Sequence, residues 1–306
     1  MKVLITGGCG FIGSNLAIRC QKMNWDVTVI DWDKNKQDWR SEANKVDLVY
    51  RDYSDPEILD WIKQQYFDII FHQAAIPRVS YSVKNPAATN DENITKTVRL
   101  LEAIKNQSVR FIFASSSSVY GNADIPTKED VFRCSTPQSP YALQKKTCEE
   151  YIRLFNKIHG LDAICLRYFN VIGPYQYGDS PYATALSSWC HRIKNNIPLR
   201  KDGSGEQSRD LCPVDNVVQA NILAATAKKK FTGQGINIAC GERTTNNEIL
   251  SELRKRFDFE VEQQPFREGD IMHTQADISL AQEIIGYTPV IHFWEGFEKT
   301  LRWWNL

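Results

Sequence analysis

The chain has 306 residues, and its 37 lysine and arginine side chains balance its 37 aspartate and glutamate side chains, so the formal net charge is zero. A neutral chain has no general attraction to nucleic acid or to an anionic membrane surface, and we expect neither as a partner. The length exceeds that of one simple core and suits a nucleotide-binding domain joined to a smaller substrate domain.

Membrane insertion, secretion and metal binding are also not expected. No apolar run approaches the roughly 18 residues that a membrane span needs, and the first residues lack the pattern of a signal peptide. The eight cysteines include no pair spaced as Cys-x-x-Cys, and they are predicted to be small buried side chains rather than zinc ligands or disulfides. These features predict a reduced, cytoplasmic protein.

The first half of the chain alternates short apolar runs with amphipathic stretches. Continuous apolar runs are typical of parallel strands that are buried on both faces. The alternation predicts an α/β fold with a doubly wound parallel sheet of the Rossmann type. The predicted strands are Val3–Thr6, Val27–Ile30, Ile69–His72, Phe111–Ala114 and Leu161–Tyr168. The predicted helices are Ser14–Met23, Pro56–Gln65, Asn93–Asn106 and Tyr141–Ile158.

After about residue 170 the alternation becomes irregular, and glycine and proline cluster at residues 173–174 and 203–205. We therefore assign residues 1–168 to the nucleotide-binding Rossmann domain. Residues 169–306 are assigned mainly to a smaller C-terminal substrate domain, with some of this chain returning to the main sheet. Trp303 and Trp304 are predicted to close a packing seam.

A glycine-rich segment directly follows the first predicted strand and opens the first predicted helix. Gly7 permits a tight turn, Gly10 lets the backbone approach a pyrophosphate, and Gly13 allows helix and strand to pack closely. The start of the helix adds unpaired N–H groups and a partial positive charge. A glycine pattern alone also fits a plain turn, but its place between strand and helix predicts dinucleotide binding. The expected cofactor contacts of this segment are Gly7, Gly10, Phe11, Ile12 and Gly13.

Asp31 ends the second predicted strand, where a carboxylate can accept hydrogen bonds from both hydroxyls of a ribose. The same charge would repel a 2′-phosphate, so Asp31 favours NAD over NADP; the alternative is an exposed turn residue. Lys34, Lys36 and Arg40 follow closely and leave NADP open.

A second carboxylate, Asp52, follows the third strand. It is assigned to the cofactor site, at the adenine amino group. A helix-capping role before Pro56 is the alternative for this residue.

Tyr141 and Lys145 lie four residues apart in a predicted helix and therefore on one face of it. A phenol normally titrates at about pH 10. A neighbouring ammonium and an oxidised nicotinamide both favour the phenolate, so we expect Tyr141 to act as a base near neutrality. The serine run 115–118 follows an apolar strand, at the carboxyl end where ligands of open α/β sheets bind. Each pattern alone is common, but their order after the glycine segment predicts one catalytic group.

With these motifs the chain resembles the extended short-chain dehydrogenase/reductase superfamily, and within it the NAD-dependent epimerase/dehydratase family. The resemblance runs from Val3 to about Trp304. The matching segments are TGGCGFIGSN (6–15), FHQAA (71–75), FASSSSVYG (113–121), YALQK (141–145), LRYFNVIGP (166–174), GSGEQSRD (203–210) and FREGD (266–270). The chain most resembles 4-epimerases of UDP-glucose and UDP-N-acetylglucosamine. Its C-terminal half looks most like bacterial epimerases of UDP-N-acetylhexosamines, on residues 208–225, 237–245 and 267–279.

The resemblance implies that Ser116, Tyr141 and Lys145 are catalytic, and that Tyr141 and Lys145 also contact the cofactor. Ser116 is the serine that stands four residues before the tyrosine of the SSSSVYG segment. Family members that dehydrate hexoses have Asp-Glu directly after the catalytic threonine or serine, whereas this chain has two further serines there. This difference argues against a 4,6-dehydratase.

The resemblance also implies which residues bind a sugar nucleotide. Ser116 would hold the sugar hydroxyl, and Asn170, Arg209 and Arg267 would bind the pyrophosphate, arginine through its planar fork. Without the family, each arginine fits a surface salt bridge equally well. Residues 201–202 are Lys-Asp where relatives have a hydrophobic residue and an aromatic that packs on the base, so the base is left open.

Three further residues are assigned to substrate binding. Arg78 is expected to reach a phosphate, a substrate carboxylate or solvent. Asp270 belongs to the REGD segment, and Thr274 follows it by four residues. In sugar-nucleotide 4-epimerases a tyrosine at this second position limits the enzyme to hexoses, and a smaller residue admits an N-acetyl group. Thr274 therefore predicts that UDP-GlcNAc and UDP-GalNAc are accepted, alone or beside UDP-Glc and UDP-Gal.

We expect reversible NAD-dependent 4-epimerisation of a UDP-sugar through a 4-keto intermediate, in the context of polysaccharide biosynthesis. The alternatives are a UDP-uronic acid 4-epimerase, a CDP-sugar 2-epimerase, a decarboxylase, a net NDP-sugar dehydrogenase and a non-catalytic NAD-binding module. Such modules often lose the tyrosine or the lysine, and this chain keeps both. By analogy with the family, a homodimer is expected through the helices Asn93–Asn106 and Tyr141–Ile158.

Overall fold

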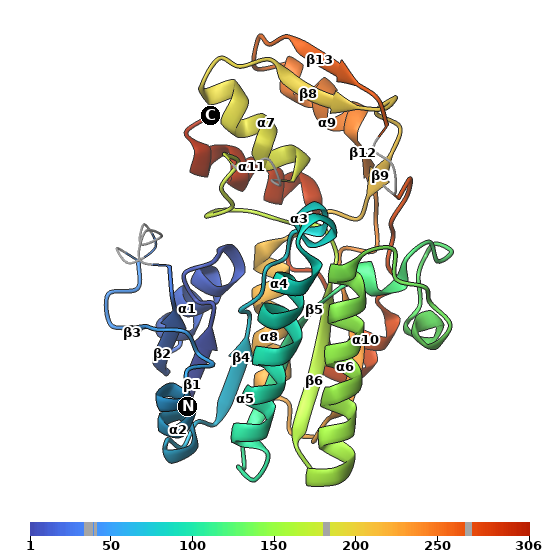
Figure 1. Ribbon diagram of the computed structural model, residues 1–306. Coiled ribbons are helices and arrows are strands. Elements are labelled where there is room, and N and C mark those ends of the chain that lie inside the picture. Colours follow the sequence, from blue (N-terminus) through green and yellow to red (C-terminus); the bar gives the residue numbers. More distant parts are fainter. Residues whose placement is uncertain (34–38, 40–41, 180–183, 267–270) are drawn as a thin grey trace.

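A seven-stranded parallel sheet forms the centre of the larger part of the molecule (Figure 1). The structure is a computed structural model, and it describes residues 1–33, 39, 42–179, 184–266 and 271–306. Across the sheet the strands are β11 (Thr232–Ile238), β6 (Asp162–Tyr168), β5 (Arg110–Ser116), β4 (Ile69–His72), β1 (Lys2–Thr6), β2 (Asp26–Asp31) and β3 (Asp47–Tyr50). All neighbouring strands of this sheet run parallel.

Helices cover both faces of the sheet, because its central strands are apolar on both faces and must be shielded from water twice. One face packs against α1 (Phe11–Lys22), α8 (Val214–Thr226) and α10 (Ser279–Ile285). The other face packs against α2 (Pro56–Gln64), α5 (Lys96–Ile104) and α6 (Pro140–His159). The predicted doubly wound α/β fold is confirmed.

All the strands and helices listed from the sequence are present, and their ends differ by at most three residues. The largest differences have local causes. Helix α1 begins at Phe11 because Gly10 supplies its N-cap, and α5 begins at Lys96 because a π-helical turn, Asp91–Thr95, precedes it. β11 comes from the later half of the chain and pairs with β6; the division of the domains at residue 168 stays a prediction.

The strand order reverses at β1. The chain runs from β1 to β2 and β3 on one side, and then crosses to β4 on the other side of β1. In open parallel sheets such a reversal opens a crevice at the carboxyl ends of the strands, and ligands bind there. The glycine segment follows β1 and therefore lies at this crevice.

A smaller group of elements lies beyond the carboxyl ends of the main strands (Figure 1). It contains α7 (Ala185–Lys194), β8 (Leu199–Asp202), β9 (Ser208–Arg209), β12 (Thr244–Thr245), α9 (Asn246–Arg254), β13 (Val261–Gln264) and α11 (Phe293–Trp304). The short connecting elements are α3 (Val79–Lys84), α4 (Pro86–Asn90), β7 (Val171–Ile172) and β10 (Cys212–Pro213).

Two tryptophans of α11 join the two parts of the molecule. Trp303 packs against the core on the α1 and α8 face of the sheet, with edge contacts to Tyr175 and Tyr177. Trp304 belongs to the apolar core of the smaller part and contacts His191. The predicted packing seam is confirmed.

Among the helices that the structure describes, none is long and apolar enough to cross a membrane. Seven of the eight cysteines are buried, and only Cys134 is exposed. The buried cysteines pack as small apolar side chains, as the sequence predicts.

Candidate active site

The loop after β1 is shaped by glycine at two positions where a side chain would not fit. Gly7 has a φ of +70°, and a Cβ there would lie 2.6 Å from the Cα of Ala74. A Cβ at Gly13 would lie 2.7 Å from the Cα of Gly8, so the start of α1 packs directly on the loop. Gly10 is the N-cap of α1, and no side chain of the described residues caps its first turn. This cradle of bare backbone at a helix N-terminus fits the pyrophosphate of a dinucleotide.

Asp31 lies beside this loop at the end of β2. Its carboxylate accepts hydrogen bonds from the backbone N–H of Cys9 at 2.9 Å and from that of Asp33 at 2.9 Å. The side chain is thus buried against the loop, in the place where a ribose would follow the pyrophosphate. Phe11 and Ile12 form the first turn of α1 and are partly buried against the core. Lys34, Lys36 and Arg40 lie outside the described residues.

Asp52 is already engaged by its neighbours. It accepts hydrogen bonds from the backbone N–H and the hydroxyl of Ser54, and from the Nζ of Lys96 at 2.6 Å. The Lys96 and Ser54 contacts outweigh burial and lower the pKa of Asp52. Helix α2 has Asp55 as its N-cap. The helix-capping alternative for Asp52 is therefore wrong, and its assignment to the adenine stays a prediction.

Local sequence signals position the catalytic helix α6. Ser139 is the N-cap, and its hydroxyl accepts a hydrogen bond from the N–H of Ala142. Pro140 occupies the first helical position, where its missing N–H costs nothing. The helix start is thereby fixed, which places Tyr141 in the first turn and Lys145 one turn later on the face toward β5.

The structure brings the three predicted catalytic residues together. Ser116 is the last residue of β5, and its Oγ accepts a hydrogen bond from the backbone N–H of Ser118 at 3.2 Å. Tyr141 is buried, and its phenol contacts the Ser116 side chain. The Lys145 Nζ donates a hydrogen bond to the carbonyl of Ala114 at 2.7 Å and lies 6.0 Å from the centre of the Tyr141 ring.

Burial dominates the electrostatics of this group. It raises the pKa of Tyr141 to about 12, although the Ser116 contact acts in the opposite direction. It lowers the pKa of Lys145 to about 8, so that this ammonium loses its proton more readily than a surface lysine. The sequence-based expectation combined the Lys145 charge with that of an oxidised nicotinamide, and in the protein without cofactor burial keeps the pKa of Tyr141 high. The phenolate needs a further positive charge, such as that of an oxidised nicotinamide.

A second polar cluster lies where the smaller part of the molecule meets the sheet. The Nδ2 of Asn170 donates to the hydroxyl of Thr274 at 3.0 Å and to the carbonyl of Asp210 at 3.1 Å. Asn170 has a φ of +30°, a left-handed conformation that asparagine tolerates better than most residues. Arg209 donates to the carbonyls of Ser208 and Met272. The structure thus brings Asn170, Arg209 and Thr274 together, although they are far apart in the sequence.

The remaining predicted substrate residues have different outcomes. Arg78 is partly buried just before α3, and burial lowers the pKa of its guanidinium while the Asp179 charge raises it. Arg267 and Asp270 lie outside the described residues.

Sequence reasoning missed three buried residues that contact the catalytic group or its elements. Ser82 of α3 accepts a hydrogen bond from the N–H of Tyr141 at 3.1 Å. Glu149 and Arg167 form an ion pair with an N–O distance of 2.7 Å under α6. Two signals could have found this pair: Glu149 follows Tyr141 and Lys145 at the same four-residue interval, and Arg167 interrupts an apolar strand.

The chain matches a family model and three solved structures along most of its length. The model described as "NAD dependent epimerase/dehydratase family" matches residues 3–239. The chain is 36% identical to UDP-N-acetylglucosamine 4-epimerase from Methanobrevibacter ruminantium M1, solved in complex with UDP-N-acetylmuramic acid. That alignment has a TM-score of 0.90 and covers 99% of this chain and 98% of that chain.

Two further structures are similar. UDP-glucose 4-epimerase from Thermotoga maritima, solved with UDP-glucose, is 30% identical with a TM-score of 0.92, over 100% of this chain and 99% of that chain. UDP-glucuronic acid 4-epimerase from Bacillus cereus, solved with UDP-glucuronic acid and NAD, is 29% identical with a TM-score of 0.92, over 100% and 99%.

Proposed function

Because this chain belongs to the NAD-dependent epimerase/dehydratase family, we propose that it interconverts the two C4 epimers of a UDP-sugar. The chain is an NAD-dependent sugar-nucleotide epimerase; the position of epimerisation and the sugar are the proposal. The observation that carries it is the convergence of Ser116, Tyr141 and Lys145 at the carboxyl end of β5, on the same edge of the sheet as the glycine loop after β1. A 4-keto intermediate explains why a reaction without net oxidation needs a redox cofactor.

We propose that the cofactor is held by the loop Gly7–Gly13, with Asp31 at the ribose and Tyr141 and Lys145 at the nicotinamide end. The bare backbone of the loop and the buried Asp31 carboxylate fit a dinucleotide without a 2′-phosphate. NAD supplies the acceptor for the hydride of carbon 4 and the donor that returns it. Because the same cofactor is regenerated in each turnover, we expect it to be retained tightly.

Tyr141 acts as the base in this proposal. It takes the proton from the 4-hydroxyl as the hydride leaves carbon 4, and it returns that proton after the keto sugar has turned its other face. Ser116 donates a hydrogen bond to the reacting oxygen, and Lys145 stabilises the phenolate by its charge. Because the pKa of Tyr141 is high in the protein alone, proton removal depends on the bound cofactor. The reaction is therefore limited to the complex of protein, cofactor and substrate.

For the sugar, the Asn170–Thr274 cluster supports N-acetylated substrates. Thr274 is small, and its hydroxyl is held by the Asn170 amide and by the N–H of Asp210 at 3.3 Å. A short side chain fixed in this way leaves room that a tyrosine would fill. We therefore propose UDP-GlcNAc and UDP-GalNAc as substrates, with or without UDP-Glc and UDP-Gal, and Arg209 as a partner of the pyrophosphate.

A UDP-uronic acid is the second candidate, and Arg78 is the observation that favours it. Arg78 directly precedes α3, which holds the first turn of the catalytic helix through Ser82. A partly buried guanidinium this close to the catalytic helix could bind the carboxylate of a uronic acid. Replacing Arg78 by Met would then remove activity on UDP-glucuronic acid and spare the neutral sugars.

One experiment separates these substrates. The purified protein, without added NAD, is incubated with a panel of UDP-, CDP- and GDP-sugars, and the products are identified by proton NMR. The proposal predicts a mixture of the two C4 epimers from UDP-GlcNAc. A product changed at another carbon, or a net oxidised product, would contradict it.

We also propose a homodimer. The outer face of α6 exposes four apolar side chains, which are Leu143, Tyr151, Leu154 and Ile158. Exposed apolar patches of this kind mark interaction surfaces. Light scattering after size exclusion should report twice the chain mass, and Leu154→Glu with Ile158→Glu should halve it.

A further inference from the structure

Helix α6 carries three polar residues on the face that it buries against the sheet. Tyr141, Lys145 and Glu149 follow one another at four-residue intervals, and each is buried. The proposed function above uses the first two. A fully buried carboxylate is costly unless it is paired, so Glu149 needs its own explanation.

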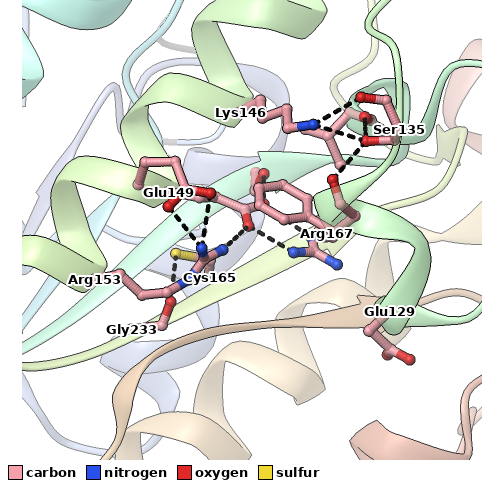
Figure 2. Close-up of polar contacts among 12 residues, drawn as sticks. Glu129, Ser135, Lys146, Glu149, Arg153, Cys165, Arg167 and Gly233 are labelled. Carbon is pink, nitrogen blue, oxygen red and sulfur yellow. Dashed lines mark hydrogen bonds and ion pairs between the residues drawn. The ribbon is translucent and has the colours of Figure 1, made fainter.

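Every oxygen of the Glu149 carboxylate is engaged (Figure 2). Oε1 accepts from the hydroxyl of Ser115 at 2.5 Å and from the Nε of Arg167 at 3.0 Å, and Oε2 accepts from a terminal nitrogen of Arg167 at 2.7 Å. Arg153 approaches Oε2 at 3.6 Å from the partly exposed side. The contact with Arg167 is bidentate, the geometry that fixes direction as well as distance.

The pair extends into a row across three strands. Ser115 of β5, Arg167 of β6 and Asn237 of β11 stand in register. The phenol of Tyr120 joins the last two, because it accepts from Arg167 at 2.7 Å and donates to Asn237 at 2.5 Å. The Asn237 amide in turn donates to the carbonyl of Asp277 at 3.0 Å. The row therefore connects α6 to the chain that follows Thr274.

The sheet makes room for this guanidinium. A Cβ at Gly235 would lie 2.5 Å from the Cζ of Arg167, so only glycine fits beneath it. Phe132 covers the other side, with its ring centre 4.2 Å from the same carbon. The arginine is held by packing as well as by its charges, which gives it one position.

Three successive turns of α6 thus contact three consecutive residues of β5. Lys145 binds the carbonyl of Ala114, Glu149 binds the hydroxyl of Ser115, and Tyr141 contacts Ser116. We propose that Glu149 and Arg167 are positioning residues: the pair locks α6 against the ends of β5 and β6, so that Tyr141 and Lys145 stay at Ser116. The expected effect of this pair on turnover rests on the proposed function. Its expected effect on the pKa of Lys145 does not.

Glu149 also acts on Lys145 through its charge. The charged and titratable groups that face Lys145 are Tyr141, Cys148 and Glu149 on α6, Cys165 on β6 and His72 on β4. Burial lowers the pKa of Lys145 to about 8, and Cys148, Cys165 and Glu149 oppose that fall. Burial raises the pKa of both thiols and so favours their neutral form, which leaves Glu149 as the negative charge among the three. Removing the charge should therefore lower the Lys145 pKa further.

The test compares Glu149→Gln with Asp162→Asn. The second variant weakens the Arg110–Asp162 pair, which lies at the opposite end of β5 and β6. Lysine labelled with ¹³C at Cε is titrated by NMR in both variants, with Lys145→Arg to assign the signal. In Glu149→Gln we expect a lower Lys145 pKa and a kcat reduced about 100-fold, the scale of a misplaced catalytic group, with KM unchanged. Asp162→Asn should leave the Lys145 pKa and kcat unchanged.

Several outcomes would overturn the proposal. An unchanged Lys145 pKa in Glu149→Gln would refute the charge effect of Glu149 on Lys145, whether or not the wild type epimerises the sugar. An unchanged kcat in that variant, with an active wild type, would remove the effect on catalysis. If Glu149→Gln does not fold, Ser115→Ala is the test variant. It removes one hydrogen bond to Glu149 and should lower kcat less than Glu149→Gln would. A wild-type kcat in Ser115→Ala would refute the locking of α6 to β5.

Discussion

An arginine–carboxylate pair lies at each end of the neighbouring strands β5 and β6, and the two pairs are built differently. At the amino end, Arg110 binds Asp162 at 2.9 Å, and their side chains are 12% and 16% exposed. Arg110 also donates to backbone carbonyls after α8, such as that of Ala227. At the carboxyl end, Arg167 and Glu149 are 2% and 0% exposed, and they bind side chains.

The two arginine–carboxylate pairs differ in their burial, and this difference suits them to different roles. The amino-end pair joins β5, β6 and the end of α8 near water, where a lost partner can be replaced by solvent. The carboxyl-end pair is fully desolvated and lies one helical turn from Lys145, where a lost partner leaves a buried charge. Polar groups that must hold one position gather at the carboxyl ends of the strands, where the proposed catalytic group lies.

The largest expected effect comes from the tyrosine at the carboxyl end. Tyr141→Phe removes the proposed base and keeps the ring, so kcat should fall about 100- to 10,000-fold while NAD remains bound. Tyr66→Phe is the matched control, because Tyr66 is exposed and belongs neither to the catalytic group nor to the proposed dimer surface. Product formation by NMR and the NAD content of the purified protein are measured. Near-normal turnover by Tyr141→Phe would refute the assignment.

The two arginines give the next largest difference. Arg167→Met leaves Glu149 buried without its main partner and should lower the free energy of unfolding by about 3–5 kcal/mol. Arg110→Met should cost less, because Asp162 lies nearer to water. Urea denaturation of both variants measures the difference. An equal loss of unfolding free energy in the two variants would contradict the stated difference between the two arginine–carboxylate pairs.

Beyond the carboxyl ends, Thr274 tests the substrate proposal. Thr274→Tyr should lower kcat/KM for UDP-GlcNAc at least about 10-fold more than for UDP-glucose, since a filled pocket excludes the larger substituent. Thr274→Ser is the control, because it keeps the hydroxyl that binds Asn170. If Thr274→Tyr treats both sugars alike, the pocket argument fails.

The smallest effect is a pH dependence carried by Lys145. Its pKa is about 8 in the folded chain and 10.5 for an unperturbed lysine, so between these pH values the unfolded chain binds more protons. The free energy of unfolding should therefore rise with pH in this window, while kcat falls as the ammonium is lost. Thermal unfolding and kcat are measured across it. Lys145→Met should abolish the rise, and a rise that persists there would assign it to another group.

Local sequence patterns predict much of the fold and the candidate site. The apolar runs give the central strands, because parallel strands are buried on both faces. The glycine loop, Asp31 and the Tyr141–Lys145 spacing depend on neighbours within a few residues, and they occupy the expected elements.

The contacts that the sequence does not reveal are those made across the fold. Asn170 and Thr274 are separated by 104 residues, and their hydrogen bond follows from how the smaller part meets the sheet. Arg167 reaches Glu149 only because β6 lies beside β5 under α6. The high pKa of Tyr141 likewise comes from its burial, which the spacing of two residues in the sequence does not reveal.

The central claim is that the hydride removed from carbon 4 returns to carbon 4 in the same turnover. UDP-GlcNAc and UDP-glucose, each deuterated at carbon 4, are incubated with the purified protein in ordinary water without added NAD. We predict that the C4 epimer forms with deuterium retained at carbon 4, and that NADH absorbance does not accumulate. Loss of deuterium to the solvent, or accumulation of NADH with an oxidised sugar, would contradict the account.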